Sequence, residues 1–252
     1  MKWFKYLLVF LLLTTPVWGI TVMIMGGSTP DLCADMGASG TYKFWLNCDY
    51  SGDTDKACVN SGASTKDGTI NGATIDTWTN FGISGPTNGG TYGIKLDSAD
   101  EYISYAISSG DIINTSEGTI ALDIYRTTSN NTITYAQCGT GDDEITATVG
   151  SNDTLYTKHK GDANIVSFTT TGSISLSTWT VIRIAWSVTS NEVAVKIGGS
   201  SWETDSDADT VTAFSSAATA LEIGDGPSGN GLGDTFYIDN FRVSSTYKDE
   251  SL

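Results

Sequence analysis

The amino-acid sequence predicts an all-β protein in which two antiparallel sheets pack face to face. Short runs of alternating apolar and polar residues recur along the chain, and no run of helical length keeps a 3.6-residue period. Turn residues separate these runs at intervals typical of β-sandwiches and barrels. The composition agrees with this, because the chain has 28 glycines and only 4 prolines and is rich in Ser, Thr and Asn.

The clearest pair of strands is a hairpin formed by residues 179–188 and 191–197. Ile182, Ile184 and Trp186 share one parity of the first run, and three residues join it to the second run. In the run 118–125, alternation places Asp123 and Tyr125 on the outer face. Further strands are expected at residues 101–107, 145–149, 154–158, 165–170, 221–223 and 236–243.

The first 19 residues are typical of a secretory signal peptide. A short basic segment, 1–5, precedes the apolar run 6–13, and small residues end the segment at Gly19. The apolar run is shorter than the ~20 residues that a bilayer span needs, so an uncleaved anchor is the lesser alternative. We therefore expect a secreted or cell-surface protein without a membrane span after cleavage. Residues 20–40 form a lead strand, and 41–252 form one domain.

Export favours disulfide bonds for the four cysteines, because secreted proteins fold in an oxidising environment. No Cys-x-x-Cys pair suggests a zinc or redox site. Three connectivities are possible, and we favour Cys48–Cys58 because the turn-rich segment between them closes cheaply. Cys33 would then pair with Cys138.

The charge of the chain excludes several functions. With 13 Lys and Arg against 29 Asp and Glu, the formal net charge is −16. Such a chain repels phosphate backbones, so nucleic acid is not an expected partner. The single histidine, His159, excludes a metal site made of several histidines.

Four motifs follow one another in a recognisable order. They are Phe44-Trp45-Leu46 with Asp49-Tyr50-Ser51-Gly52, the run 93–103, the run 118–125 with Trp179 and 193–199, and Leu221-Glu222-Ile223-Gly224 with 237–243. Together they resemble the laminin G-like, concanavalin A-like jelly-roll superfamily of lectins and glucanases over about residues 41–252. Ile124 or Tyr125 stands where the family usually has Trp, and Asn240 replaces an aspartate. The resemblance implies a jelly-roll sandwich.

Enzymes related to this superfamily carry catalytic patterns that this sequence lacks. The nearest equivalent of the glucanase pattern Glu-x-Asp-x-x-Glu begins at Glu203 and ends in Ala208. No Gly-x-Ser-x-Gly elbow is present, and a lyase set cannot be assembled around His159. We therefore expect no catalytic activity.

A structural calcium ion is expected at Asp239. Strand parity groups Asp239 with the apolar Phe241 and Val243, and an unpaired carboxylate near a core needs a partner or a cation. The resemblance implies the same, since the aspartate of the similar terminal strand ligates Ca²⁺ in several sandwich carbohydrate-binding families. Asp49 or an N-terminal carbonyl would be its companion, and an aspartate that only caps local amides is the alternative. A second, weaker cation candidate is the turn with Asp97 and Asp100.

Sugar binding requires aromatic faces and fixed polar groups, and outward positions of one sheet supply both. The candidate ligand-binding residues are Asp123, Tyr125, Arg183 and Lys196, with Tyr156 and Trp202 as rim aromatics. Trp45, Trp179 and Trp186 are assigned to the core. The leading hypothesis is a secreted, non-catalytic recognition domain, lectin-like, that binds an extracellular glycan or cell-surface ligand and holds a structural calcium; an adhesive role belongs to the self-assembling alternative. The alternatives are a self-assembling structural protein and a divergent glycoside hydrolase or polysaccharide lyase.

Overall fold

The structure is a computed structural model that describes twelve stretches of the chain. They are residues 42–49, 55–59, 64–98, 101–106, 112–127, 131–138, 143–150, 152–161, 164–205, 209–214, 218–224 and 235–252. All of them belong to one compact unit, Asp31–Leu252, and the other unit is Met1–Pro30. The expected signal peptide, 1–19, and lead strand, 20–40, lie outside the described residues. Within the stretches above, no helix combines the length and apolarity that crossing a bilayer would require.

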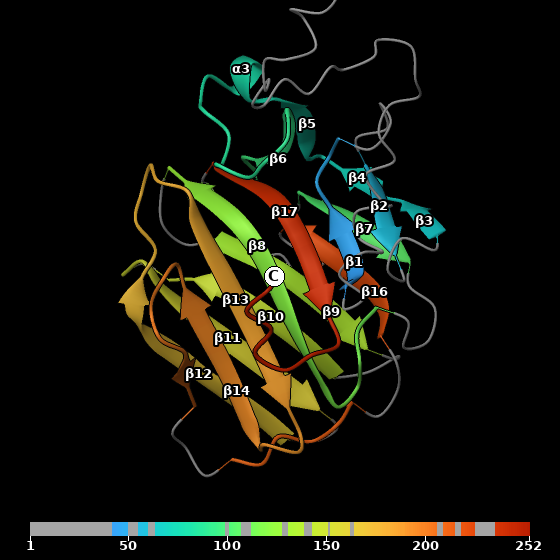
Figure 1. The fold of residues 1–252 in the computed structure, drawn as a ribbon, viewed down its shortest axis with the longest axis vertical. Helices are drawn as coiled ribbons and strands as arrows, with labels where there is room; N and C mark the ends of the chain where they lie inside the picture. Colours follow the sequence, from blue (N-terminus) through green and yellow to red (C-terminus); the bar gives the residue numbers. More distant parts are fainter. Residues whose placement is uncertain are drawn as a thin grey trace, which may run out of the picture. The chain divides into compact units, whose positions relative to one another are not determined.

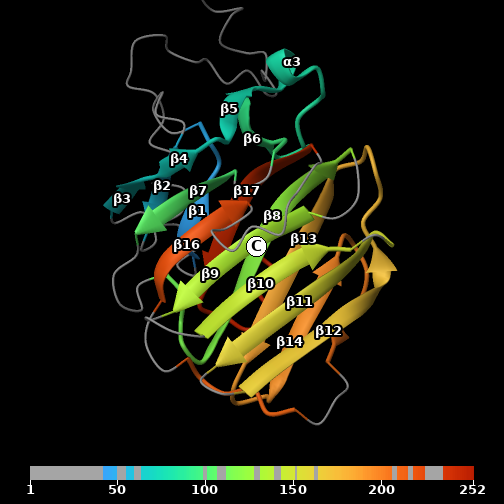
Figure 2. The same cartoon turned by 180° about the vertical axis from the view of Figure 1, so that it is seen from behind.

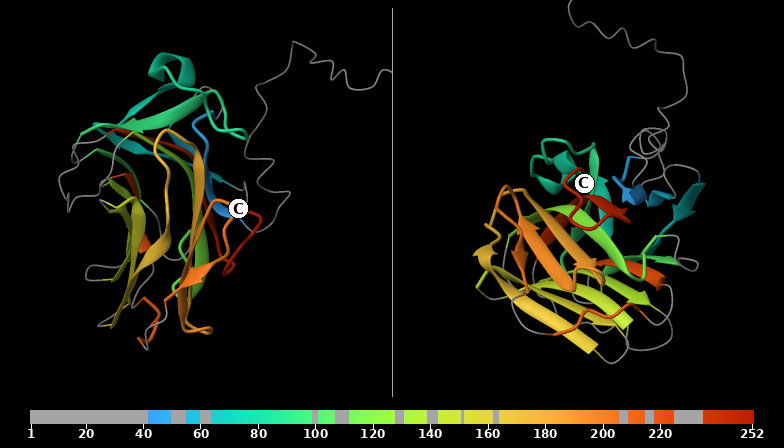
Figure 3. Two further views of the ribbon diagram at one scale, coloured as in Figure 1. Left: turned by 90° about the vertical axis from the view of Figure 1, so that its left-hand side faces the viewer. Right: turned by 60° about the horizontal axis from the view of Figure 1, so that its bottom comes forward.

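Two antiparallel sheets pack against each other in this unit, as Figure 3 shows from the side. Over the described residues the larger sheet has ten strands, in the order β15-β14-β13-β8-β17-β1-β2-β3, with β6 beside β17 and β5 beside β6 (Figure 1). Their bounds are β1 (Tyr42–Leu46), β2 (Lys56–Val59), β3 (Ser64–Asp67), β5 (Thr74–Thr77), β6 (Tyr92–Leu96), β8 (Glu117–Arg126), β13 (Thr180–Ser187), β14 (Glu192–Ile197), β15 (Glu203–Thr204) and β17 (Phe236–Ser244).

The smaller sheet has seven strands over the described residues, in the order β12-β11-β10-β9-β16-β7-β4 (Figure 2). Their bounds are β4 (Thr69–Asn71), β7 (Tyr102–Ala106), β9 (Asn131–Cys138), β10 (Asp143–Val149), β11 (Thr154–Gly161), β12 (Asn164–Ser173) and β16 (Ala218–Gly224). A single helical turn, α3 (Trp78–Phe81), lies between β5 and β6.

The predicted all-β sandwich is confirmed. The expected hairpin is β13–β14, where Ile184 pairs with Val195 on one side and with Ile120 of β8 on the other. The side chains that alternate toward the inside of these strands pack against the smaller sheet in one apolar core. Trp186 is 1% exposed there, as the sequence predicts.

The expected Cys48–Cys58 disulfide is wrong. Cys48 is a free, buried thiol, whereas Cys58 is disulfide-bonded. Their side chains lie on opposite faces of the larger sheet, because Cys48 packs in the main core and Cys58 packs with Tyr42 and Trp45 on the outer face. The turn-rich segment between Cys48 and Cys58 can bring their backbones close, but it does not direct both side chains to the same face of the sheet. The second expected disulfide, Cys33–Cys138, involves Cys33, which lies outside the described residues.

A β-bulge in β17 overturns the expected placement of Asp239. Two residues of β17, Asn240 and Phe241, stand opposite a single residue of β8. Asn240 takes the left-handed conformation that this bulge needs, with φ 49°. The extra residue shifts the parity, so Phe241 joins the core but Asp239 does not share its face. Asp239 instead lies opposite the outward Asp123.

A buried arginine connects the two sheets. Arg126, at the end of β8, has no exposed surface. Its Nη1 donates to the carbonyl of Ile174 at 2.8 Å, and its Nη2 donates to Oδ1 of Asp153 at 2.7 Å. Asp153 directly precedes β11 and Ile174 directly follows β12, and both strands belong to the smaller sheet. The guanidinium at the end of β8 therefore links the larger sheet to the smaller one.

We expect Arg126→Met to lower the free energy of unfolding by about 3 kcal/mol, because it leaves the Asp153 carboxylate and a buried carbonyl without their donor. Urea unfolding followed by tryptophan fluorescence measures the change. The matched control is Lys95→Ala, which breaks the more exposed Lys95–Asp97 pair and should cost less than about 1 kcal/mol. Equal costs for the two variants would contradict the role assigned to Arg126.

Candidate functional site

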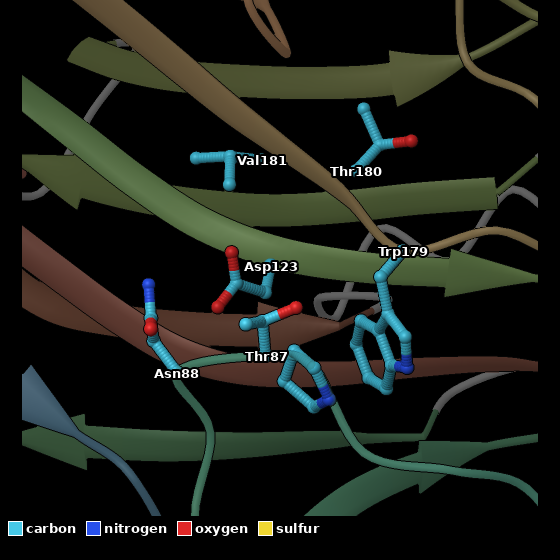
Figure 4. A pocket seen from close by; sticks show the side chains of 7 residues that line it. Thr87, Asn88, Asp123, Trp179, Thr180 and Val181 are labelled. Atoms are coloured by element: carbon cyan, nitrogen blue, oxygen red, sulfur yellow. The ribbon is translucent and has the colours of Figure 1, made fainter.

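Two adjoining depressions lie on the outer face of the larger sheet. The first, of about 270 Å³, is lined by Pro86, Thr87, Asn88, Asp123, Trp179, Thr180 and Val181 (Figure 4). The second, of about 430 Å³, is lined by Tyr42, Trp45, Asn88, Asp123, Val181, Arg183, Asn240, Arg242, Glu250, Ser251 and Leu252. They share Asn88, Asp123 and Val181, so we treat them together as the outer groove.

Strand alternation places the floor residues of the outer groove. On β8, Leu122 and Ile124 point into the core, so Asp123 between them points outward. On β1, Trp45 likewise stands between the buried Phe44 and Leu46. The same rule turns the odd-numbered residues at the start of β13 outward. The groove therefore follows directly from which parity of each strand is apolar.

An aromatic cluster holds the loop between α3 and β6 over the sheet. The ring of Trp179 lies 5.1 Å from that of Trp78 and 5.6 Å from that of Tyr125. The Nε1 of Trp179 donates to the carbonyl of Ser84 at 2.7 Å, and that of Trp78 donates to the carbonyl of Gly90 at 3.0 Å. These contacts fix both ends of residues 84–90 and bring Pro86, Thr87 and Asn88 to the groove.

The bulge residue Asn240 ties three elements together at the centre of the groove. Its Nδ2 donates to Oδ2 of Asp123 at 2.8 Å and to the carbonyl of Asn88 at 3.3 Å. Burial raises the pKa of Asp123, while the hydrogen bond from Asn240 and the charges of Arg242 and Arg183 oppose that shift. The result is a fixed carboxylate and a fixed amide beside the aromatic wall, and Figure 4 shows Asp123 between Asn88 and Trp179.

The Trp45 end of the groove carries two half-buried arginines. The Nε of Arg183 donates to the carbonyl oxygen of Leu252 at 2.9 Å, and the Nε of Arg242 donates to the carbonyl of Asn240 at 3.1 Å. Burial and the neighbouring charge of Arg242 lower the pKa of Arg183. The Nε1 of Trp45, in the same wall, is buried and has no hydrogen-bond acceptor among the described atoms.

Behind the loop lies a pair of carboxylates, Asp49 and Asp239, of which Asp239 is only 1% exposed. Oδ1 of Asp239 accepts from its neighbour's amide, N of Asn240, at 2.7 Å, whereas its Oδ2 has no hydrogen-bond partner among the described residues. A Cβ on Gly89 would lie 2.3 Å from Oδ2 of Asp239, and one on Gly90 would lie 1.2 Å from Oδ2 of Asp49. Two successive glycines therefore allow both carboxylates to pack against the loop.

The charge of Asp239 is poorly stabilised in this position. Burial raises the pKa of Asp239 to about 8; the backbone amides of Asn240 and Gly90 oppose the shift, and the negative charges of Asp123 and Asp49 add to it. Asp49 is better supported, because the backbone amide of Thr91 donates to its Oδ2 at 2.9 Å. The pair thus holds one carboxyl group that is either protonated near neutral pH or paired with a cation.

The structure brings together two of the four expected metal ligands, Asp239 and Asp49. Asp97 instead forms an ion pair with Lys95, and Asp100 lies outside the described residues. Across the described stretches no group of three or more His, Cys, Asp or Glu residues is arranged to hold a metal ion. Any cation at the pair would therefore depend on backbone oxygens as well.

The expected ligand-binding residues have different outcomes. Asp123 and Arg183 line the outer groove, and Tyr125 packs against its Trp179 wall. Lys196 and Trp202 do not line the groove, but both reach Glu250, which does, at 2.6 and 2.7 Å. Tyr156 lies on β11 of the other sheet, so it is not part of this site.

Several groove residues were not expected from the sequence. Trp45 and Trp179, assigned to the core, are half-buried and line the groove. Trp45 stands between two apolar residues of its strand, so alternation places it on the outer face of the sheet. The core assignment followed from residue type alone and is wrong. Asn240 and Arg242 were missed because the bulge is not visible in the alternation. Asn88 was missed because a loop folded over the sheet supplies it.

No protein-family model matches the chain, and no curated protein matches it by sequence. Solved structures match it by fold. The botulinum neurotoxin type G receptor binding domain has a TM-score of 0.55 and 12% identity, covering 84% of this chain and 49% of that chain. The binding domain of botulinum neurotoxin DC in complex with SialylT has a TM-score of 0.58 and 11% identity, covering 84% and 49%.

A third match is the botulinum neurotoxin serotype D ligand binding domain in complex with N-acetylneuraminic acid, with a TM-score of 0.55, 12% identity, and coverage of 86% of this chain and 50% of that chain. The chain thus spans about half the length of the structures it matches. At this level of identity the likeness shows a shared fold.

The raised pKa of Asp239 predicts a pH dependence of stability. The native carboxyl keeps its proton up to about pH 8, whereas the unfolded chain releases it near pH 3.9. Between these values the native state binds more protons, so its stability is greatest at low pH and falls as the pH rises. We expect Asp239→Asn to remove up to about 1.4 kcal/mol per pH unit of this slope between pH 5 and 8.

Urea unfolding in the presence of a chelator, repeated at each pH, measures the slopes. Glu222, with its pKa raised to about 6 by burial, contributes with the same sign in both proteins and largely cancels in the difference. Asp97→Asn is the matched control and should leave the slope as in the wild type. Parallel curves for the wild type and Asp239→Asn would refute the assignment.

Proposed function

We propose that the protein is a secreted, non-catalytic recognition domain that binds a carbohydrate in the outer groove. The observation that carries this proposal is the meeting of aromatic walls with a fixed polar centre. Trp45 and Trp179 line the groove on either side of the Asp123–Asn240 hydrogen bond. A sugar ring offers apolar C–H faces to such walls and hydroxyl groups to such a centre.

The arrangement of carboxylates supports binding without catalysis. Bond cleavage by a retaining glycosidase needs two carboxyl groups about 5 Å apart across the substrate. Here Asp123 and Asp239 are neighbours on adjacent strands of one sheet, and Asp239 is covered by the loop. Glu250 is already bonded by Lys196 and Trp202. Glu250, which lines the groove with Asp123, is thus held in an ion pair and a hydrogen bond.

The fold and the chain's own chemistry support the wider assignment. The order of motifs favours a jelly roll of the laminin G-like, concanavalin A-like type, a superfamily that includes lectins. One structural neighbour was solved in complex with N-acetylneuraminic acid. The N-terminal signal pattern and the disulfide at Cys58 favour an extracellular or cell-surface location, and hence an extracellular glycan as the partner.

We further propose that the Asp49–Asp239 pair is the place where a structural Ca²⁺ would bind. The unpartnered, buried Oδ2 of Asp239 supports this, because a hard cation would supply the missing interaction. The role of such an ion would be to hold the loop that carries Gly89 and Gly90 against the sheet. Protonation of Asp239 is the competing way to satisfy the same atom.

We expect the wild-type protein to bind members of a glycan array, and Trp45→Ala and Trp179→Ala each to weaken that binding at least tenfold, or about 1.4 kcal/mol. Each change removes one apolar face of the groove. Titration calorimetry with the best-bound glycan measures the effect. Tyr156→Ala is the matched control, since this aromatic is 40% exposed on the other sheet. Failure of the wild type to bind any glycan would refute the proposed function.

We expect millimolar CaCl₂ to raise the melting temperature of the wild type relative to the protein in chelator, because a ligand that binds only the native state stabilises it. The rise should be larger at pH 8 than at pH 6, since Ca²⁺ needs the deprotonated carboxylate. Asp239→Asn and Asp49→Asn should abolish it, and Asp97→Asn should not. No shift at either pH would refute the calcium proposal while leaving glycan binding open to its own test.

A further inference from the structure

A row of positive charge crosses the outer face of the larger sheet. Strand pairing places Lys196 of β14 opposite Arg183 of β13, Arg183 opposite Ala121 of β8, and Ala121 opposite Arg242 of β17. Trp45 of β1 stands opposite Arg242 and ends the row within the groove. Of the other four residues in this row, three are cations, and the side chain of the fourth, Ala121, is too small to separate them.

Such a row needs a physical reason in this chain. The formal net charge is −16, with only 13 Lys and Arg in 252 residues. Like charges on neighbouring strands destabilise a sheet, and both arginines are half-buried, which adds a desolvation cost. Burial and the charge of Arg242 lower the pKa of Arg183, while the charges of Glu250, Asp123 and Asp249 oppose that shift.

The acidic groups near the row pair with Lys196 or accept hydrogen bonds from uncharged side chains. Glu250 forms the ion pair with Lys196 at 2.6 Å. Asp249 accepts from the hydroxyl of Ser244 at 2.7 Å, and Asp123 accepts from Asn240. Among the described residues, neither Arg183 nor Arg242 forms an ion pair with an aspartate or glutamate.

Arg183 and Arg242 differ in how many of their N–H groups are already used in hydrogen bonds. Arg183 is directed to the carbonyl oxygen of Leu252 through both Nε and Nη2. Within the described part of the chain, Arg242 donates through its Nε alone, to the carbonyl of Asn240. A guanidinium has five N–H donors, so the terminal nitrogens of Arg242 are available in a groove that it lines.

Resting on the proposed carbohydrate-binding function, we propose that the outer groove binds an acidic glycan, whose carboxylate or sulfate group is held by Arg242 beside Trp45. Planar or branched oxyanions match the paired N–H groups of a guanidinium. Arg183 supports the binding through its charge. The sugar ring adjoining the anion packs on Trp45, and the hydroxyl groups farther along the chain reach Asp123, Asn240 and Asn88.

The groove is therefore polarised along its length. Arg183 and Arg242 lie at its Trp45 end, and the Asp123 carboxylate at its centre repels a second anion placed toward the Trp179 end. The ligand should accordingly carry its charge at one position and neutral rings next to it. A uniformly charged polymer fits this arrangement less well than a glycan with a single acidic residue at the bound end.

The test compares acidic glycans with their own neutral forms. The wild type is titrated with two acidic disaccharides that each carry one charge at one end, together with their neutral forms, after an array that contains acidic glycans and their neutral counterparts. The pairs are cellobiouronic acid with its methyl ester, and 3′-sulfolactose with lactose. We expect at least tenfold tighter binding of the acidic member of the best-bound pair, and the two pairs distinguish carboxylate from sulfate. Equal affinity for acidic and neutral members would overturn the inference but leave the proposed function standing.

Variants assign the effect to one side chain. Arg242→Gln should weaken binding of the acidic glycan at least tenfold and leave binding of its neutral form unchanged. Arg242→Lys, which keeps the charge but loses the paired donors, should fall between the two. The control Lys66→Gln, on β3, removes the same charge outside the groove and should change neither affinity. An unchanged affinity in Arg242→Gln would overturn the inference.

Folding and binding are separated in the same series. The melting temperature of each variant is measured first, and Arg242→Lys serves if Arg242→Gln does not fold. The salt dependence gives an independent readout, because it should be steeper for the acidic glycan than for the neutral form and should flatten in Arg242→Gln. If no glycan of either kind binds the wild type, the proposed function fails together with the inference.

Discussion

The site depends on one extra residue in β17. The bulge at Asn240 lets the same strand place Phe236 and Ile238 in the core before it, and Phe241 and Val243 after it. It also changes what the strand offers outward, from Tyr237 and Asp239 to Arg242. Without the bulge, Asp239 and Phe241 would share a face, and either a carboxylate would enter the core or an aromatic ring would leave it.

The bulge is useful because a loop is held down over it. Trp78 and Trp179 anchor residues 84–90 by packing and by their indole hydrogen bonds. Gly93 makes room for this, since a Cβ there would lie 1.6 Å from the Trp78 ring. The bulge buries Asp239 behind the loop and places the amide of Asn240, itself 5% exposed, in the wall of the groove. One backbone irregularity thus positions both a buried carboxyl and a buried amide.

Electrostatics and burial act against each other throughout this face. The carboxylates near the loop lie where water is excluded, so their charged forms are disfavoured. On the same face, Arg183 and Arg242 lie on either side of Ala121, although the chain has a large excess of negative charge. The chain's C-terminal residues, 250–252, contribute carbonyl and carboxylate oxygens to this region, and Figure 1 shows them crossing the outer face of the sheet. Local arrangement, and not net charge, determines which ligands such a face attracts.

The alternation of side chains along β8, β13 and β14 was sufficient to predict the sandwich, its central hairpin and the outward positions of Asp123 and Arg183. Those properties depend on neighbours in sequence, because a strand turns successive residues to opposite faces. The bulge, the loop over it and the face of each cysteine depend on strand pairing between distant segments. Periodicity carries no information about register, so only the tertiary structure could place Asn240, Arg242 and Asn88 in one groove and separate Cys48 from Cys58.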